Sequence, residues 1–360
     1  MEIGKCQVNY LVGQHCIPRR RKIRAVKRQI RCSAKEVPMP RSHDYRPFTN
    51  GATQTLLALS LDTAGTCLTK MKPIKPLYKI AYQAGQACAD LVSRATRFYT
   101  CNEDPLRYRM QLLTRIYEAD TVELVRKITR PGMIALDIGA NVGYYTRLLS
   151  TLVGGSGHVL AFEPNPHIFT LLHQNTWELS NVSLIEMAVG HIDGEATLYD
   201  SLSESGGASL RYDAREVADL KTVHRGQALA PRIVDDLPTA TYSVKTTSID
   251  SYLSERHISE VNMVKIDIEG AELDALRGME DIVQRSKQMA MFIELNPRTL
   301  RQFGSDPLEL WSKLCDMNFE IMAISGKQLL MPLTTKDSML ELAETIHGYV
   351  NLFCRKRDWH

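Results

Sequence analysis

The sequence predicts an α/β protein built on an open, doubly wound sheet. Short apolar runs alternate with segments of helical periodicity from about residue 115 to the C-terminus, as expected when helices connect parallel strands. Two of these runs lead into Asp137 and Asp267, and glycines follow both carboxylates. Carboxylates and glycines at the carboxyl ends of strands are typical of a ligand site at the edge of a parallel sheet.

The charge of the chain is distributed unevenly. Residues 1–50 contain twelve Lys or Arg and three Asp or Glu, whereas the whole 360-residue chain carries a net charge of only +3. Such a basic segment, with four prolines and few aromatic residues, is expected to be a solvated, disordered arm. We therefore divide the chain into a basic arm at residues 1–50, a helical N-terminal extension at residues 51–114 and an α/β domain at residues 115–360.

Cysteine usage and hydropathy indicate the cellular compartment. The eight cysteines are scattered without a C-x-x-C pair, which is typical of free thiols in a reducing compartment. No apolar run approaches the roughly 20 residues of a membrane span, and the N-terminus lacks the pattern of a secretory signal. We expect a cytoplasmic protein without a membrane span; the sequence leaves its oligomeric state open.

Two helices are expected before the first strand of the sheet. Apolar residues recur at helical spacing between residues 77 and 100, which predicts a helix at the edge of the domain. A second helix is expected over Asp120–Ile128, because Pro131 and Gly132 follow it.

The first strand, Met133–Leu136, leads into Asp137 and a glycine turn. Gly139 and Gly143 allow main-chain N–H groups to approach a ligand before a helix begins near Val142. Their G-x-x-x-G spacing differs from the G-x-G-x-x-G pattern that holds a pyrophosphate, which argues against NAD. The carboxylate of Asp137 suits a cationic or amine-bearing cofactor instead.

The second strand, His158–Phe162, ends in Glu163. A carboxylate at the end of the adjacent strand can accept both hydrogen bonds of a ribose diol, which favours a nucleoside ligand. Asn165, followed by Pro166, is expected to cap the next helix. The segments expected to follow are a strand at Val182–Ala188, extended stretches at Glu195–Tyr199 and Tyr242–Thr247, and between those two a long loop or lid at residues 200–240.

A second group of carboxylates follows the buried strand near Met263–Ile266. Asp267, Glu269 and Glu272 lie within six residues where this strand is expected to enter a helix. Glu269 and Glu272 could simply stabilise the positive end of that helix, whereas Asp267 is harder to explain by packing. Lys265, on an otherwise apolar strand, is expected to pair with one of these acids.

The C-terminal part completes the predicted sheet. A fifth strand, Met289–Leu295, carries Glu294 near its end, and strands near residues 319–324 and 349–355 are expected to pair in antiparallel fashion, with residues 329–347 as the excursion between them. The chain thus has seven predicted core strands.

These residues resemble the FkbM family of S-adenosylmethionine-dependent methyltransferases over about residues 115–325. The matching segments, in order, are Leu136–Thr146, Phe162–Pro166, Ala188–Gly190, Ala208–Leu210 and Lys265–Glu272. The resemblance implies a seven-stranded Rossmann-like methyltransferase fold that binds S-adenosylmethionine. It also implies that the methionine part is held by Asp137, Gly139, Asn141 and Gly143, the ribose by Glu163, and the adenine by the region around Ala188. His191 departs from the family, which usually has Asp after Ala-Val-Gly.

The resemblance further implies an O-methyltransferase that acts on a hydroxyl of a sugar, glycolipid, polyketide or related secondary metabolite. Asp267 and Glu269 are the expected catalytic residues on the acceptor side, because a hydroxyl must lose its proton to become a nucleophile. A divalent metal is possible here, because hard oxygen ligands gather on this side, but it is not predicted, since the sequence shows no dedicated set of ligands.

Two other functions stay open. The first is a nucleic-acid methyltransferase anchored by the basic arm. The acidic acceptor region and the lack of an Asp/Asn-Pro-Pro-Tyr/Phe motif argue against it. The second is a non-catalytic binding protein on the same fold.

Overall fold

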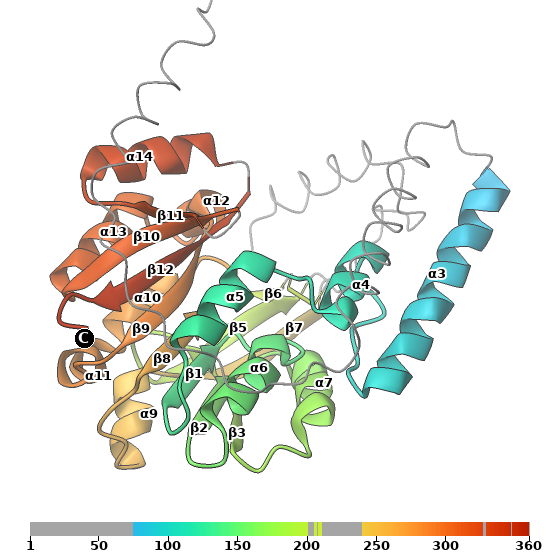
Figure 1. Cartoon of the computed structure of the whole chain (residues 1–360), viewed down its shortest axis with the longest axis horizontal. Coiled ribbons are helices and arrows are strands. Elements are labelled where there is room, and N and C mark those ends of the chain that lie inside the picture. The colour runs from blue at the N-terminus through green and yellow to red at the C-terminus, as the bar shows by residue number, and fades with distance from the viewer. Residues whose placement is uncertain are drawn as a thin grey trace, which may run out of the picture. The chain divides into compact units, whose positions relative to one another are not determined.

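An eight-stranded sheet lies at the centre of the structure, a computed structural model that describes residues 75–200, 205–206, 208–210, 240–326, 329–346 and 348–359 (Figure 1). The strands follow one another across the sheet in the order β11 (Leu329–Pro332), β10 (Phe319–Ser325), β12 (Val350–Lys356), β9 (Ala290–Leu295), β8 (Met263–Ile266), β1 (Ile134–Ile138), β2 (His158–Phe162) and β3 (Val182–Ile185). The five strands from β9 to β3 are parallel, whereas β12, β10 and β11 pair in antiparallel fashion. The predicted open α/β sheet is confirmed, and β11 adds an eighth strand to the seven expected.

The strand order places a crevice next to β1. The chain runs outward from β1 through β2 to β3 and later returns to β8 on the other side of β1. Ligands bind at such a reversal of strand order, beyond the carboxyl ends of the strands. Asp137 of β1 is level with Lys265 of β8, and Ile138 is level with Phe162 of β2. Residues that follow these strands therefore meet at one edge.

Helices cover both faces of the sheet. The face that carries Ala135 and Phe292 packs against α5 (Ala119–Ile128) and α6 (Tyr144–Val153), and α7 (Pro166–Thr176) covers the same side through Leu172 and Ala161. The other face, which carries Leu136 and Ile266, is covered by α9 (Ile249–Glu255), α10 (Glu272–Arg277), α11 (Glu280–Arg285), α12 (Pro297–Gln302), α13 (Pro307–Asp316) and α14 (Lys336–Thr345). Both faces are buried, which explains why the parallel strands read as continuous apolar runs.

A second, four-stranded sheet has the order β4 (Ala188–Val189), β7 (Ala240–Thr247), β5 (Gly194–Asp200) and β6 (Ala208–Ser209). It confirms the extended segments predicted on both sides of residues 200–240. The single strand predicted at Val182–Ala188 is wrong. The main chain leaves the large sheet after Ile185, because Ala188 pairs with Thr246 in the second sheet.

Two helices precede α5. The predicted helix at residues 77–100 corresponds to α3 (Lys75–Thr96), and α4 (Leu106–Thr114) was not predicted. The buried guanidinium of Arg109 in α4 donates hydrogen bonds to Asp90 of α3 at 2.6 Å and to Thr100 at 2.9 Å. The Asp90 side chain is half exposed, but the guanidinium is buried, and losing its partners would leave that buried charge unpaired. Arg109 thus ties α4 to α3.

Some predictions fall outside the described residues. These are the disordered basic arm at residues 1–50 and most of the loop at residues 200–240. The domain boundaries at residues 50 and 114 stay predictions. None of the described helices is long and apolar enough to cross a membrane.

Candidate cofactor and acceptor site

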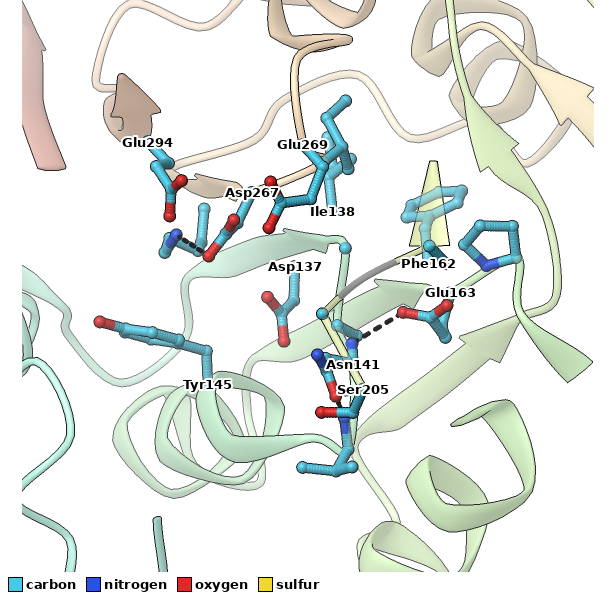
Figure 2. A pocket seen from close by; sticks show the side chains of 18 of the residues that line it. Asp137, Ile138, Asn141, Tyr145, Phe162, Glu163, Ser205, Asp267, Glu269 and Glu294 are labelled. Atoms are coloured by element: carbon cyan, nitrogen blue, oxygen red, sulfur yellow. Dashed lines mark hydrogen bonds and ion pairs between the residues drawn. The ribbon is translucent and has the colours of Figure 1, made fainter. Parts of the chain in front are cut away.

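A cavity of about 480 Å³ opens at the carboxyl edge of β1, β2, β8 and β9. Its walls come from the turn after β1, the start of α6, the ends of the neighbouring strands, α4 and the short segment at residues 205–210. Figure 2 shows that the predicted residues Asp137, Asn141, Glu163, Asp267 and Glu269 all line this one cavity. The structure therefore brings the two groups of sequence-predicted residues together.

The glycine turn after β1 holds its own N–H groups within the protein. Gly139, Asn141 and Gly143 have φ values of +82°, +48° and +90°, a left-handed conformation that favours glycine and asparagine. The N–H groups of Gly139 and Ala140 donate to the carbonyl of Phe162. Those of Asn141, Val142 and Gly143 donate to Glu163 Oε2, Asn141 Oδ1 and the Ala140 carbonyl, respectively. Each of these N–H groups thus already has an acceptor within the protein, and their approach to a ligand stays a prediction. A turn without free donors cannot hold a pyrophosphate, which strengthens the argument against NAD.

Asp137 provides a buried acid at the end of β1. Asp137 is 1% exposed, and its Oδ2 accepts a hydrogen bond from Thr146 Oγ1 at 2.5 Å. Burial raises the pKa of this carboxyl to about 6, and the Thr146 hydroxyl opposes the shift. A cationic group in the cavity would favour the carboxylate, as expected for the ammonium of a bound amino acid.

Glu163 is held at the end of β2 by the main chain on both sides. Oε2 accepts from the N–H of Asn141 and Oε1 from the N–H of Asn165, each at 2.9 Å (Figure 2 shows the first of these bonds). Burial raises the pKa of Glu163 to about 7, although the two hydrogen bonds act to lower it. Each carboxylate oxygen can accept a second bond, so a fixed pair of acceptors is available to a diol. Asn165 also caps α7, as predicted.

The second sheet supplies the apolar side of the cavity. Ala188, predicted at the adenine contact, is 4% exposed and lines the cavity together with Met187, Val189 and Leu198. Phe162 of β2 also lines the cavity. A flat, apolar ring can be covered here without burying unpaired polar groups.

The side of the cavity that is expected to face the acceptor contains the predicted carboxylates and Lys265. Lys265 Nζ lies 3.0 Å from Asp267 Oδ2, which confirms that this lysine pairs with a neighbouring acid. Burial lowers the pKa of Lys265, but the charges of Asp267, Glu118 and Glu294 outweigh it and raise the pKa above its usual value. Asp267 and Glu269 reach the cavity directly (Figure 2).

Glu272 does not belong to the site. Its Oε1 accepts hydrogen bonds from the N–H groups of Ile268 at 3.2 Å and Gly270 at 3.1 Å, at the start of α10. Burial raises its pKa to about 7. Glu272 therefore has a structural role, but these two hydrogen bonds reach the loop before α10, and not the N–H groups of the helix as the sequence had suggested. They shape the loop that contains Glu269.

Sequence reasoning did not find several residues of the acceptor side. Glu118 precedes α5, and its Oε2 accepts a hydrogen bond from the hydroxyl of Tyr145 at 2.5 Å. The cavity is also lined by Tyr108, Tyr117, Tyr144, Tyr145 and Tyr349. The glycine turn could have pointed to Tyr144 and Tyr145, which follow it directly, whereas Glu118 carries no motif at all.

An open α/β sheet with a glycine turn after β1 and buried acids at the ends of β1 and β2 is the arrangement expected of S-adenosylmethionine-dependent methyltransferases. The buried acids and the apolar pocket fit this cofactor, with a cationic end and a nucleoside end. The sequence of residues 137–321, just over half of the chain, matches the methyltransferase FkbM domain. The chain belongs to this family and contains an S-adenosylmethionine-dependent methyltransferase domain.

Several curated proteins are similar to this chain. Methyltransferase 1 of Beauveria bassiana is 30% identical over 150 residues, which are 41% of this chain and 58% of that protein. The hexuronic acid methyltransferase AglP of Haloferax volcanii is 26% identical over 46% of this chain and 58% of its own length. The 2-O-methyltransferase NoeI of Sinorhizobium fredii is 24% identical over 46% of this chain and 65% of its own length. The chain thus matches about six tenths of the length of these relatives.

Solved structures show a weaker likeness. An S-adenosylmethionine-dependent O-methyltransferase of Thermotoga maritima has 13% sequence identity and a TM-score of 0.34, over 68% of this chain and 71% of that one.

Proposed function

We propose that this protein transfers a methyl group from S-adenosylmethionine to a hydroxyl of a sugar, glycolipid, polyketide or related secondary metabolite. The observation that carries this proposal is the position of Asp267 and Glu269, whose carboxylates line the same cavity as the cofactor residues Asp137 and Glu163. The names of similar proteins support it. They include the 2-O-methyltransferase NoeI and the 31-O-demethyl-FK506 methyltransferase FkbM of Streptomyces tacrolimicus, which is 28% identical over 185 residues.

The cofactor half is assigned residue by residue. Asp137 would face the ammonium of the methionine part, and Gly139, Asn141 and Gly143 form the turn beside it. Glu163 would accept the two ribose hydroxyls, and Ala188 would contact the adenine ring. When bound, S-adenosylmethionine supplies an electrophilic methyl group on a sulfonium.

The acceptor half must align a hydroxyl and remove its proton. Asp267 is the proton acceptor in this assignment: the O–H bond of the acceptor breaks, its proton passes to the carboxylate, and the oxygen forms the new bond to the methyl carbon. The S–CH₃ bond breaks at the same time and its electron pair stays on sulfur. Glu269 would orient the acceptor by accepting a second hydrogen bond. Positioning and proton removal are the principal contributions that such a site makes.

The nucleic-acid alternative depends on the basic arm, which lies outside the described residues. The acceptor side that is described carries the carboxylates of Glu118, Asp267, Glu269 and Glu294, and such a surface repels phosphate. The non-catalytic alternative gives no role to the acids beside the cofactor residues.

The decisive experiment incubates the full chain with methyl-labelled S-adenosylmethionine and separate panels of glycans, polyketides and oligonucleotides. Mass spectrometry should show the label on a hydroxyl oxygen of one of the first two panels. Label on an oligonucleotide would favour the nucleic-acid alternative. S-adenosylhomocysteine binding without label in any panel would favour a binding protein.

A further inference from the structure

Three carboxylates from distant parts of the chain converge on the acceptor side. One oxygen each from Glu118, Asp267 and Glu294 lies within 4.8 Å of the other two. Glu118 precedes α5, Asp267 follows β8 and Glu294 lies on β9. Carboxylate oxygens at this separation match the ligand spacing of a hard divalent cation, which binds oxygen at about 2.0–2.6 Å.

One cation of the described residues lies against this cluster. Lys265 is 2% exposed and contacts Asp267 Oδ2, and its charge also acts on Glu118 and Glu294. Three acidic side chains thus share one ammonium. A buried carboxylate is expensive without a compensating charge, and a bound dication would supply one.

Two of the carboxylates have oxygens that the protein leaves unused. Glu294 is only 6% exposed, lines the cavity, and accepts no hydrogen bond from the described residues; Figure 2 shows its carboxylate on the same side of the cavity as Asp267. Glu118 bonds to Tyr145 through Oε2, while its Oε1 is buried and has no partner among the described residues. Buried acceptors are normally satisfied, so these two oxygens point to a missing ligand.

We propose that Glu118, Asp267 and Glu294 bind one hard divalent cation, Mg²⁺ or Mn²⁺, at the acceptor edge of the cavity. Each residue contributes one oxygen, and acceptor hydroxyls or water complete the coordination. The hydrogen bond from Tyr145 fixes the orientation of Glu118, as groups behind a ligand do in other metal sites. No such set is visible in the sequence, because Glu118 belongs to a segment with no apparent motif.

The role of this cation in catalysis rests on the proposed function, whereas its binding does not. A cation beside the acceptor lowers the pKa of a coordinated hydroxyl. With the cation bound, Asp267 would be its ligand, and the hydroxyl proton that the proposed function gives to Asp267 would pass instead to Glu269, which is not one of the three ligands. The methyl carbon still moves from sulfur to oxygen and the sulfur keeps the electron pair.

The test measures metal binding directly. The full chain is freed of metal with a chelator and titrated with MnCl₂ alone, with binding followed by electron paramagnetic resonance, and then with MgCl₂ in competition. We expect one saturable Mn²⁺ site per chain that Mg²⁺ displaces. Glu118→Gln and Glu294→Gln should each weaken Mn²⁺ binding at least tenfold.

A matched control separates this site from weak binding at the surface. Glu320→Gln removes an exposed carboxylate that pairs with Arg355 on β10 and β12, and it should leave Mn²⁺ affinity unchanged. Absence of a saturable site, or equal affinity in all three variants, would overturn the proposal.

Measuring the S-adenosylhomocysteine affinity of the same variants distinguishes failure of the metal-site proposal from failure of the proposed methyltransferase function. It should persist in Glu118→Gln and Glu294→Gln, which also shows that these variants are folded. Loss of Mn²⁺ binding with intact S-adenosylhomocysteine binding would support the metal site whether or not an acceptor is known.

Discussion

Gly139 of the cofactor turn lies directly against the main-chain oxygen of Asp267, so that a Cβ at residue 139 would stand 1.9 Å from that oxygen. The turn after β1 and the end of β8 therefore meet without a side chain between them. This contact fixes the distance between the cofactor half of the cavity and the acceptor half. It also explains why glycine is required here independently of any ligand.

Gly139→Ala should destabilise the fold before it affects chemistry. The new Cβ would clash with main chain, and φ at this position is +82°, which side chains rarely adopt. We expect a loss of about 2–4 kcal/mol in the free energy of unfolding, measured by denaturant titration. Gly155→Ala is the control, since Gly155 is exposed and a Cβ there would meet nothing within 4 Å. Equal effects in the two variants would contradict the contact.

Glu163→Gln should weaken cofactor binding. An amide can offer only one acceptor oxygen, so one of the N–H groups of Asn141 and Asn165 would face a donor and the diol would lose a charged acceptor. Hydrogen bonds to charged groups contribute about 1.5–3 kcal/mol, which corresponds to at least a tenfold rise in the Kd of S-adenosylhomocysteine by calorimetry. Glu178→Gln, an exposed residue paired with Arg97, should leave the Kd unchanged. An unchanged Kd in Glu163→Gln would remove this residue from the cofactor site.

Cofactor affinity should rise with pH. Burial raises the pKa of Asp137 to about 6 and that of Glu163 to about 7, so both acids are partly protonated in the free protein near pH 6. A bound ammonium and a bound diol favour the two carboxylates, and binding must therefore release protons. S-adenosylhomocysteine should bind more tightly at pH 7.5 than at pH 5.5. Calorimetry at pH 6.5 in buffers of different ionisation enthalpy should detect the released protons, and uptake of protons would contradict the assignment.

Asp104 should hold residues 205 and 206 in the wall of the cavity. Its carboxylate accepts hydrogen bonds from the N–H of Ser205 at 2.6 Å and from its hydroxyl at 3.1 Å, and both residues are buried. Asp104→Ala should speed hydrogen exchange at residues 205–210 and weaken S-adenosylhomocysteine binding several-fold. Ser205→Ala keeps the main-chain bond and should have the smaller effect. Unchanged exchange in Asp104→Ala would show that this segment is held by other contacts.

The sequence predicts the sites that lie at strand ends and misses those that depend on packing between distant segments. Asp137 lies near the end of a buried strand, and Glu163 and Asp267 directly follow one. The carboxyl ends of adjacent parallel strands must meet at one edge. Glu118 reaches the same edge only because α5 packs beside α6 and Tyr145 bonds to it. No period or motif encodes that contact. Likewise, the N–H groups of the glycine turn looked available in the sequence, but the structure shows that Phe162 and Glu163 occupy three of them.

Asp267→Asn separates the two halves of the site. The side chain of Asp267 faces the acceptor and Lys265, whereas only its main-chain oxygen contacts the cofactor turn through Gly139. The variant should therefore keep S-adenosylhomocysteine affinity within about twofold and lower kcat by about 10²-fold or more, whether Asp267 acts as the base or as a cation ligand. Asp274→Asn, which removes a charge from the exposed pair with Arg277 on α10, is the matched control and should leave both values unchanged. If affinity fell in parallel with kcat, the side chain of Asp267 would belong to the cofactor half and the acceptor side would need another base.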